Sequence, residues 1–301
     1  MMLISQNSCA ALSKYIDSGE RKIFCSSLYL SAKWMVISQV VKKGLHIVVL
    51  PDKESAEYCC SDLYSFVDGD NVFFLPESGK NIERSNYKSS LAVQRTSALS
   101  RILSGEENLT IIVTYSSALS ENIPSGNTIS SDRMIIKRGD EISHDSLSEK
   151  LYEKGFEKVD FVSEPGQYAI RGSIIDIFSF SNNYPYRISL WGDEIEKINT
   201  FDCNTQLSKD DVSEVEIISE VLSSPEEEGD CLLSMLDRNT VLWLDSSDIY
   251  SQEQWFKNWS ESFVRVFLDI PPSFDKGELS VKFQISPQPK FNKNFELLTE
   301  D

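Results

Sequence analysis

Two stretches of the sequence hold the residue types with which nucleotide hydrolases bind phosphate and magnesium. The first, "SSLYLSAKW", follows a predicted strand and places Lys33 where the lysine of a phosphate-binding loop, G-x-x-x-x-G-K-[ST], would lie. Ser27 and Ala32 occupy the two glycine positions, and Trp34 replaces the hydroxyl residue that would ligate magnesium. Side chains at the glycine positions obstruct the approach of phosphate to the backbone N–H groups, and an indole cannot bind the metal. We therefore expect this loop to bind no nucleotide.

The second stretch, "VLWLDSS", has the pattern of a buried strand that ends in an acidic residue. Asp245 stands where such enzymes hold their magnesium ion, but Ser246 replaces the second acid that would polarise the attacking water. The favoured interpretation is a nucleotide-hydrolase fold that has kept its scaffold and lost its chemistry. The alternative is a fragment that retains nucleotide binding or DNA handling through Lys33 and Asp245. No G-x-S-x-G motif or spaced pair of carboxylates indicates another reaction.

The third candidate is a single arginine in the stretch "YAIRGSIIDIF". Ile170, Ile174 and Phe178 alternate along it, which predicts one continuous strand with these residues on a buried face and Arg171 on the other. Gly172, beside the arginine, suggests a bulge or the close approach of another backbone. The segments "YRISLW" and "IEKINTF", joined by a turn at "GDE", follow it, so we expect three antiparallel strands.

Two interpretations of Arg171 remain open from the residues alone. An arginine ringed by Tyr168, Phe180 or Trp191 would be a protein–protein hot spot, since arginine and large aromatic residues dominate such sites. The other interpretation is an ion pair within the protein. Residues 151–202 hold five basic against nine acidic side chains, so a phosphate-binding basic patch is not expected there.

Arg187 lies in the second of the three predicted strands and raises the same question. For this residue an ion pair within the protein, with Asp193 or Asp176, is favoured over contact with a partner.

The composition is that of a globular protein with a large acidic excess. Of 301 residues 41% are hydrophobic, and 29 Lys and Arg stand against 47 Asp and Glu, a net charge of -18 that opposes nucleic-acid binding. Six scattered cysteines without a C-x-x-C pair, and only two histidines, give poor material for a zinc site and predict reduced thiols. Without a signal-peptide pattern or a membrane-length apolar stretch, we expect a soluble cytoplasmic protein.

The order of predicted elements indicates an α/β fold with an insertion. Residues 1–127 alternate short apolar strands with helical patterns, which predicts a parallel sheet. The stretch "SENIPSGNTISSD" marks a boundary, and residues 128–212 have the pattern of an α+β module with antiparallel strands. Residues 213–301 return to α/β character and are expected to complete the first domain and to begin a linker to domains absent from this chain.

The middle module resembles a known family. "GFEKVDFVSEPGQYAIRGSIIDIF" followed by "YPYRISLWGDEIEKINTFD" is similar to the module shared by the excision-repair subunit UvrB and the bacterial transcription-repair coupling factors. "SPQPKFNKNFELL" resembles the exit from the amino-terminal region of the coupling factors. UvrB has an intact phosphate loop and a tyrosine-rich hairpin that grips DNA, and this chain has neither. The resemblance therefore favours the coupling factors, whose amino-terminal region is a degenerate RecA/helicase-like domain.

This resemblance implies an adaptor that docks the damage-recognition protein UvrA to RNA polymerase stalled at a lesion. The arginine of the family's "RG" strand matches Arg171, and Lys158, Gln167 and Tyr168 are the other expected partner contacts, whereas Ala169 stands where UvrB has a further arginine. ATP, magnesium, DNA and RNA polymerase would be bound by motor and polymerase-binding domains absent from this chain. The same surface would also contact the rest of the full-length protein and help hold the motor in check.

Overall fold

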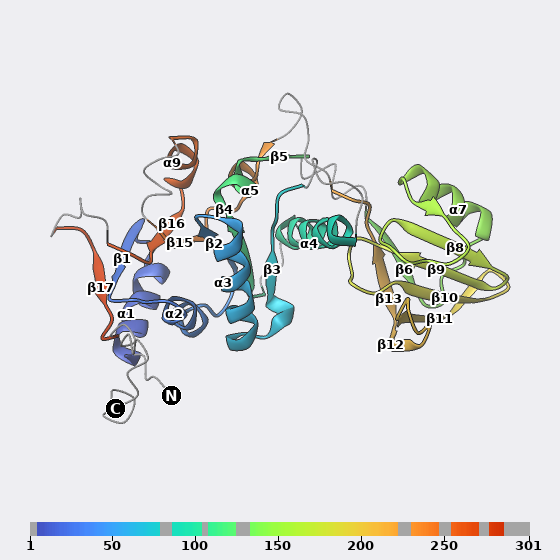
Figure 1. Ribbon diagram of the computed structural model, residues 1–301, viewed down its shortest axis with the longest axis horizontal. Helices are drawn as coiled ribbons and strands as arrows, with labels where there is room; N and C mark the ends of the chain where they lie inside the picture. The colour runs from blue at the N-terminus through green and yellow to red at the C-terminus, as the bar shows by residue number, and fades with distance from the viewer. Residues whose placement is uncertain are drawn as a thin grey trace, which may run out of the picture.

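The computed structural model describes residues 5–78, 86–103, 108–124, 133–221, 230–246, 254–270 and 277–285. The protein has two lobes that lie side by side along its longest axis, one built on a parallel sheet and the other on an antiparallel sheet (Figure 1). This arrangement confirms the predicted fold class. The predicted start of the module at residue 128 and the segment "SPQPKFNKNFELL" lie outside the described residues.

The first lobe contains a seven-stranded sheet in which every paired strand is parallel. Its strand order is β17-β1-β16-β15-β2-β4-β3, so strands that follow the module lie between strands that precede it. The interior strands are short apolar runs buried on both faces, as expected when helices cover both sides of a parallel sheet. The strands are β1 (Lys22–Ser26), β2 (Leu45–Leu50), β3 (Val72–Phe74), β4 (Thr110–Tyr115), β15 (Val241–Leu244), β16 (Val264–Phe267) and β17 (Ser280–Lys282).

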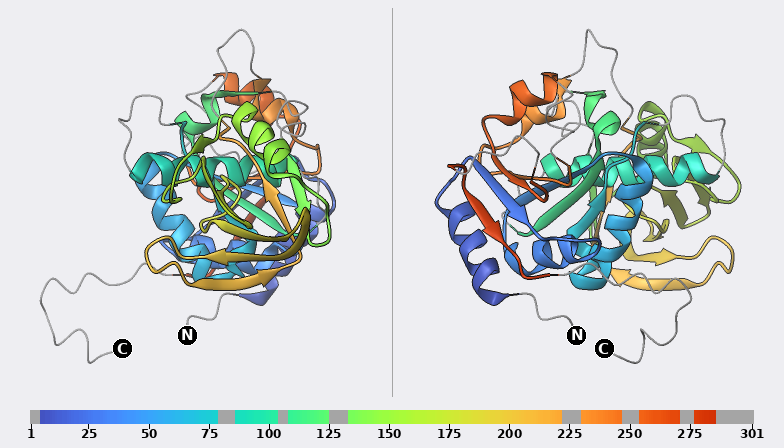
Figure 2. Two further views of the ribbon diagram at one scale, coloured as in Figure 1. Left: turned by 90° about the vertical axis from the view of Figure 1, so that its right-hand side faces the viewer. Right: turned by 60° about the vertical axis from the view of Figure 1, so that its left-hand side comes forward.

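Helices cover both faces of this sheet. Along β2, Val48 and Leu50 point to one face, while Ile47 and Val49 point to the other. The first face packs against α1 (Gln6–Asp17), α2 (Ala32–Val40) and α3 (Lys53–Phe66). The second face packs against α4 (Asn86–Leu103), α5 (Ser116–Ser120), α9 (Gln254–Ser260) and the 3-10 helix η2 (Leu232–Met235) (Figures 1 and 2). The 3-10 turn η1 (Gly69–Asn71) and the short pair β5 (Asn122–Ile123) and β14 (Asp230–Cys231) complete this lobe.

The second lobe is the predicted α+β module. Its six-stranded sheet has the order β12-β11-β10-β9-β8-β7, antiparallel except for β7 and β8, and α7 covers one face. The opposite face is the one that carries Arg171. The elements are β6 (Met134–Lys137), α7 (His144–Glu153), β7 (Glu157–Lys158), β8 (Gln167–Arg171), β9 (Ile174–Phe178), β10 (Tyr186–Trp191), β11 (Glu194–Phe201), β12 (Ser208–Val212) and β13 (Glu214–Ile217).

The expected single strand around Arg171 is wrong, because the chain turns back on itself at Gly172. Strands β8 and β9 form a hairpin with a two-residue turn, in which Arg171 pairs with Ile174 and Gly172 has a φ of +59°. A glycine with positive φ at the first central position is what a type II′ hairpin turn requires. Paired residues face the same side of a sheet, so Ile174 and Phe178 share the face of Arg171 rather than that of Ile170. The predicted three strands are therefore four, β8 to β11.

The predicted end of the module at residue 212 is also too early. Strand β13 pairs with β6 along its whole length, from Glu214 with Lys137 to Ile217 with Met134, so the module continues beyond that boundary. Its connection to the first lobe passes alongside α4. There Thr96 accepts a hydrogen bond at 3.1 Å from the buried backbone N–H of Val221, and Ala92 and Val93 pack against Phe180.

Candidate partner-binding surface and nucleotide site

The fold brings Lys33 and Asp245 together at the carboxyl edge of the parallel sheet. Lys33 lies in the first turn of α2, and Asp245 follows β15 directly. Lys33 Nζ lies 2.6 Å from Asp245 Oδ1, although the residues are 212 positions apart in the sequence. Their side chains are 19% and 18% exposed. Lys33 and Asp245, both expected in the nucleotide site, thus bind each other.

The ion pair between Lys33 and Asp245 would oppose nucleotide binding. The ammonium group that would neutralise phosphate is neutralised by the carboxylate that would hold magnesium. A nucleotide would have to break a charge-assisted hydrogen bond between two largely buried groups before it could bind. Ser27 and Leu30 have φ values of +58° and +48°, so the loop keeps left-handed turns without the glycines that make room for phosphate.

The other predicted residues of the nucleotide site have different surroundings. Trp34 is buried in the core beneath α2, where its indole packs rather than facing a ligand. Ala32 begins α2, and Ser246 follows Asp245 at the end of the described strand segment. Within the described parts of the chain, no group of three or more His, Cys, Asp or Glu residues could hold a metal ion, and no helix has the length and apolar character to span a membrane.

Arg171 has an ion pair and still faces solvent. Its Nη2 donates to Asp176 Oδ2, and its Nη1 lies 3.5 Å from the backbone carbonyl of Asp160. The guanidinium stacks on Phe161, with its carbon 4.7 Å from the ring centroid. The side chain is 31% exposed, whereas that of Asp176 is 1% exposed. Of the two open interpretations, the internal ion pair is therefore present, and the guanidinium is not buried by it.

Arg187 is held more fully by the same carboxylate. Its Nε and Nη2 donate to the two oxygens of Asp176 at 2.8 and 2.9 Å, and Nη2 also donates to Gln206 Oε1 at 2.9 Å. Its guanidinium carbon lies 4.2 Å from the centroid of the buried Phe201 ring. The hydrogen bonds to Asp176 raise the pKa of Arg187 above its ordinary value. The predicted ion pair of Arg187 is confirmed, with Asp176 as its acid.

Of the aromatic residues expected around Arg171, two lie elsewhere. Tyr168 is 2% exposed on the opposite face of the sheet, where its hydroxyl lies 2.9 Å from Ser148 Oγ of α7. The expected partner contact of Tyr168 is thus wrong, because strand alternation turns its ring into the core. Phe180 is buried against α4 and Phe156.

Trp191 is the expected aromatic residue that shares the face of Arg171. Ser189, two residues before it, pairs with Ile174, which pairs with Arg171, so the register places this part of β10 on the same face. The Trp191 side chain is 79% exposed, a large apolar surface at the tip of the β10–β11 hairpin. Phe161, 65% exposed, was missed in the sequence because it lies in a loop, where no periodicity indicates its direction.

The last two predicted contacts are placed differently. Gln167 Oε1 accepts hydrogen bonds from the backbone N–H groups of Ser163 and Glu164 at 2.9 and 3.0 Å, so this side chain ties down its own loop. Lys158 is exposed on the short edge strand β7. Its register partner is Tyr168, whose side chain points away from Arg171, so Lys158 lies on the other side of the sheet.

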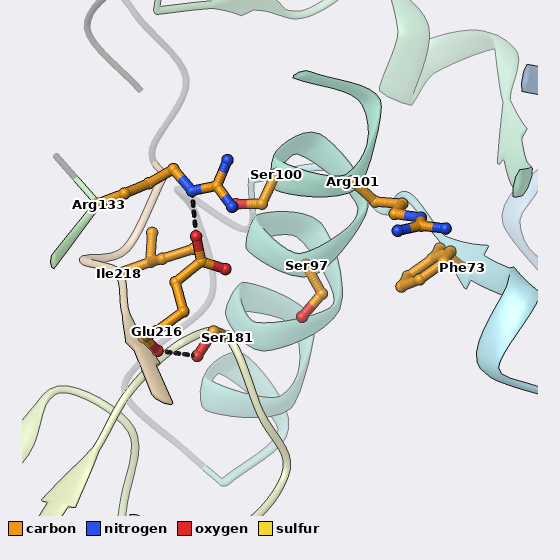
Figure 3. Close-up of a pocket in the computed structure, with 8 residues that line it drawn as sticks. All are labelled: Phe73, Ser97, Ser100, Arg101, Arg133, Ser181, Glu216 and Ile218. Carbon is orange, nitrogen blue, oxygen red and sulfur yellow. Dashed lines mark hydrogen bonds and ion pairs between the residues drawn. The ribbon is translucent and has the colours of Figure 1, made fainter. Parts of the chain in front are cut away.

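A pocket of about 170 Å³ lies where the module meets α4 (Figure 3). Arg133 at its wall forms an ion pair with Glu216, and Arg101 donates to Thr110 Oγ1 at 3.0 Å and lies over the ring of Phe73. These arginines are already engaged by neighbouring groups, so the pocket is a packing junction between the lobes rather than an evident anion site.

Fold and sites together define a class of protein. It is a parallel-sheet α/β domain in which Lys33 and Asp245 form an ion pair at the carboxyl edge of the sheet, with an inserted antiparallel module that carries a partly exposed arginine.

The comparisons with known proteins agree with this class. Residues 134–221 match the family model of the UvrB interaction domain, which begins with β6 and ends shortly after β13. The chain is 31% identical over 177 residues to the transcription-repair-coupling factor of Bacillus subtilis, covering 58% of this chain and 15% of that protein. It is 26% identical over 186 residues to that of Haemophilus influenzae (61% and 16%) and 28% identical over 202 residues to that of Staphylococcus aureus strain USA300 (66% and 17%).

These matches confirm the predicted resemblance to the amino-terminal region of transcription-repair coupling factors. The chain spans 15–17% of the length of the curated relatives named here.

Proposed function

We propose that this chain is the adaptor region of a transcription-repair coupling factor and docks the excision-repair protein UvrA through its antiparallel module. The match of residues 134–221 to the UvrB interaction domain is the observation that carries the proposal. The rest of such a protein would bind RNA polymerase and DNA and would supply an ATP- and magnesium-dependent motor in the cytoplasm. This chain contributes recognition and has no ATPase activity of its own.

The face that carries Arg171 is the part of the module best suited to a protein partner. It presents a partly exposed guanidinium next to Phe161, with Trp191 and Ile174 on the same face. Arginine and large aromatic side chains are enriched in protein–protein hot spots. The net charge of -18 over the whole chain opposes nucleic-acid binding.

A titration of UvrA with this chain, with and without Arg171→Ala, tests the proposal. Loss of a hot-spot arginine is expected to cost about 2 kcal/mol or more of binding free energy, roughly a 30-fold loss of affinity, with the fold unchanged. Arg138→Ala is a matched control. Arg138 is also partly exposed and ion-paired, but it contacts Asp211 and the backbone of Val212 in β12, at the far edge of the sheet. Undiminished binding by the Arg171 variant would remove this face from the interface.

The alternative, a nucleotide-binding fragment of a UvrB-like helicase, is addressed by calorimetry with ATP and magnesium. The ion pair of Lys33 with Asp245 supports the expectation that no saturable heat is released. A saturable site that disappears in Lys33→Ala would establish the alternative.

A further inference from the structure

Asp176 is a buried acid in the middle of the module, and it touches both arginines of the Arg171 face. It lies in β9 and pairs in register with Ala169 of β8 on one side and with Arg187 of β10 on the other. Its side chain is 1% exposed, so a partner cannot reach it. One carboxylate thus sets the positions of two guanidinium groups.

The two arginines use this carboxylate to different degrees. Arg187 has donors on Nε, Nη1 and Nη2 engaged by Asp176 and Gln206, and it is 19% exposed. Arg171 donates one hydrogen bond from Nη2 to Asp176 and one from Nη1 to Asp160. A guanidinium has five N–H groups, so three of those on Arg171 have no partner among the described residues. Arg187 is therefore held within the module, whereas Arg171 still has N–H groups that could donate to a partner.

The charges of this cluster select the chemistry of a partner. Asp176 carries one negative charge and the two guanidinium groups carry one positive charge each, so the three side chains together have a net charge of +1. Of the two arginines, Arg171 is the more exposed and brings this charge to the surface. The free N–H groups of a planar guanidinium fit a carboxylate in bidentate geometry. The exposed ring of Phe161 beside it suits an apolar neighbour of that carboxylate.

We propose that Asp176 is a positioning residue that holds Arg171 ready for a carboxylate on the docking protein, without contacting that protein itself. The inference rests on the proposed function, because UvrA is the partner in its test. A side chain that is already held in its bound orientation loses less conformational entropy when the complex forms. The carboxylate of Asp176 therefore favours binding even though it occupies part of the guanidinium.

The test is a double-mutant cycle of Asp176→Asn and Arg171→Ala, measured as affinity for UvrA. In the otherwise unchanged chain, Asp176→Asn is expected to weaken binding roughly 3- to 10-fold, the cost of ordering one long side chain. In the Arg171→Ala background the same substitution is expected to change nothing further. Asp160→Asn is the matched control, since it removes an exposed acid whose backbone carbonyl, not its carboxylate, accepts from Arg171.

Each other outcome has a distinct meaning. An equal loss of affinity for UvrA in both backgrounds would reduce Asp176 to a general structural role. Unchanged or increased affinity would show that its carboxylate only competes with the partner.

If the unsubstituted chain does not bind UvrA, the proposed function fails. Positioning is still testable then from ¹⁵N relaxation of Arg171 Nε, which should report a more mobile side chain in Asp176→Asn and overturns the inference if it does not. If Asp176→Asn does not fold, Asp176→Glu, which keeps the charge but displaces the oxygens, should show the same dependence on Arg171.

Discussion

Each lobe contains a cation held by a carboxylate, and the two arrangements have opposite consequences. At the edge of the parallel sheet, Lys33 and Asp245 pair one to one and leave no net charge. On the Arg171 face, Asp176 is shared by two arginines and leaves one positive charge at the surface. We expect the first arrangement to oppose ligand binding and the second to leave Arg171 available to a partner.

The geometry of the side chains reinforces this difference. A lysine carries its charge on one compact ammonium group at the end of a flexible stem, so the single carboxylate of Asp245 neutralises it. A guanidinium spreads its donors over a plane, so a carboxylate that holds one edge leaves the other edge available. We therefore expect the number of charges and the shape of the cation to influence whether an ion-paired side chain can still bind a ligand or a partner.

The largest expected effect comes from removing the acid of each pair. Asp176→Ala leaves two adjacent guanidinium groups without their shared counterion and should lower the free energy of unfolding by about 3 kcal/mol. Asp245→Ala should cost less, about 1 kcal/mol, because the long stem of Lys33 lets its ammonium reach water. Urea denaturation followed by circular dichroism compares the two variants. Equal losses would contradict the distinction between a shared and a one-to-one acid.

The next largest effect is a pH dependence that belongs to the parallel-sheet lobe. His46 at the start of β2 is buried, its Nδ1 accepts from the indole N–H of Trp243 at 3.2 Å, and its Nε2 lies 3.1 Å from the carbonyl of Lys43. These contacts fit the neutral ring, and burial lowers the pKa of His46 to about 4. Between pH 6.5 and about 4 the unfolded chain takes up a proton that the folded lobe does not.

Stability from His46 is therefore fully present above pH 6.5 and falls as the pH is lowered toward 4, by up to roughly 3 kcal/mol. Urea unfolding at pH 7.0, 5.5 and 4.5 measures this loss. His46→Gln, whose amide oxygen can still accept from Trp243, should flatten the profile, while His144→Gln in the module is the control. A profile unaltered by His46→Gln would assign the acid sensitivity to carboxylates instead.

The comparison between the lobes also separates what the sequence predicts well from what it does not. Apolar runs such as "LHIVVL" predict the parallel sheet because both faces of its interior strands are buried, so the direction of each side chain does not matter. Lys33 and Asp245 were expected at one site from motif spacing alone. Their mutual ion pair depends on loop geometry between residues 212 positions apart, which no local pattern indicates.

In the module, side-chain direction decides the result, and one missed turn reverses it. In a continuous strand Arg171 and Ile174 would face opposite sides, but across a two-residue hairpin they are paired and face the same side. The Gly-Ser signal for such a turn was present in the sequence. Recognising it would have placed Asp176 beside both arginines, since the register of β8, β9 and β10 then follows.

The smallest expected effect tests that turn. Gly172 has a φ of +59°, and an added Cβ would meet nothing within 4 Å, so Gly172→Ala meets only backbone strain, about 1 kcal/mol. Gly166→Ala, also at positive φ, would in addition bring its Cβ to 3.1 Å from the Phe180 ring and should cost more. Thermal unfolding ranks the stabilities of the two variants.

Because the hairpin sets the register that places Arg171 beside Asp176, Gly172→Ala should also weaken UvrA binding slightly, while the ion pair of Lys33 with Asp245 stays unaffected. A larger loss of UvrA binding from Gly166→Ala than from Gly172→Ala, measured where both variants are fully folded, would mean that the loop tied down by Gln167, rather than the hairpin, controls the Arg171 face.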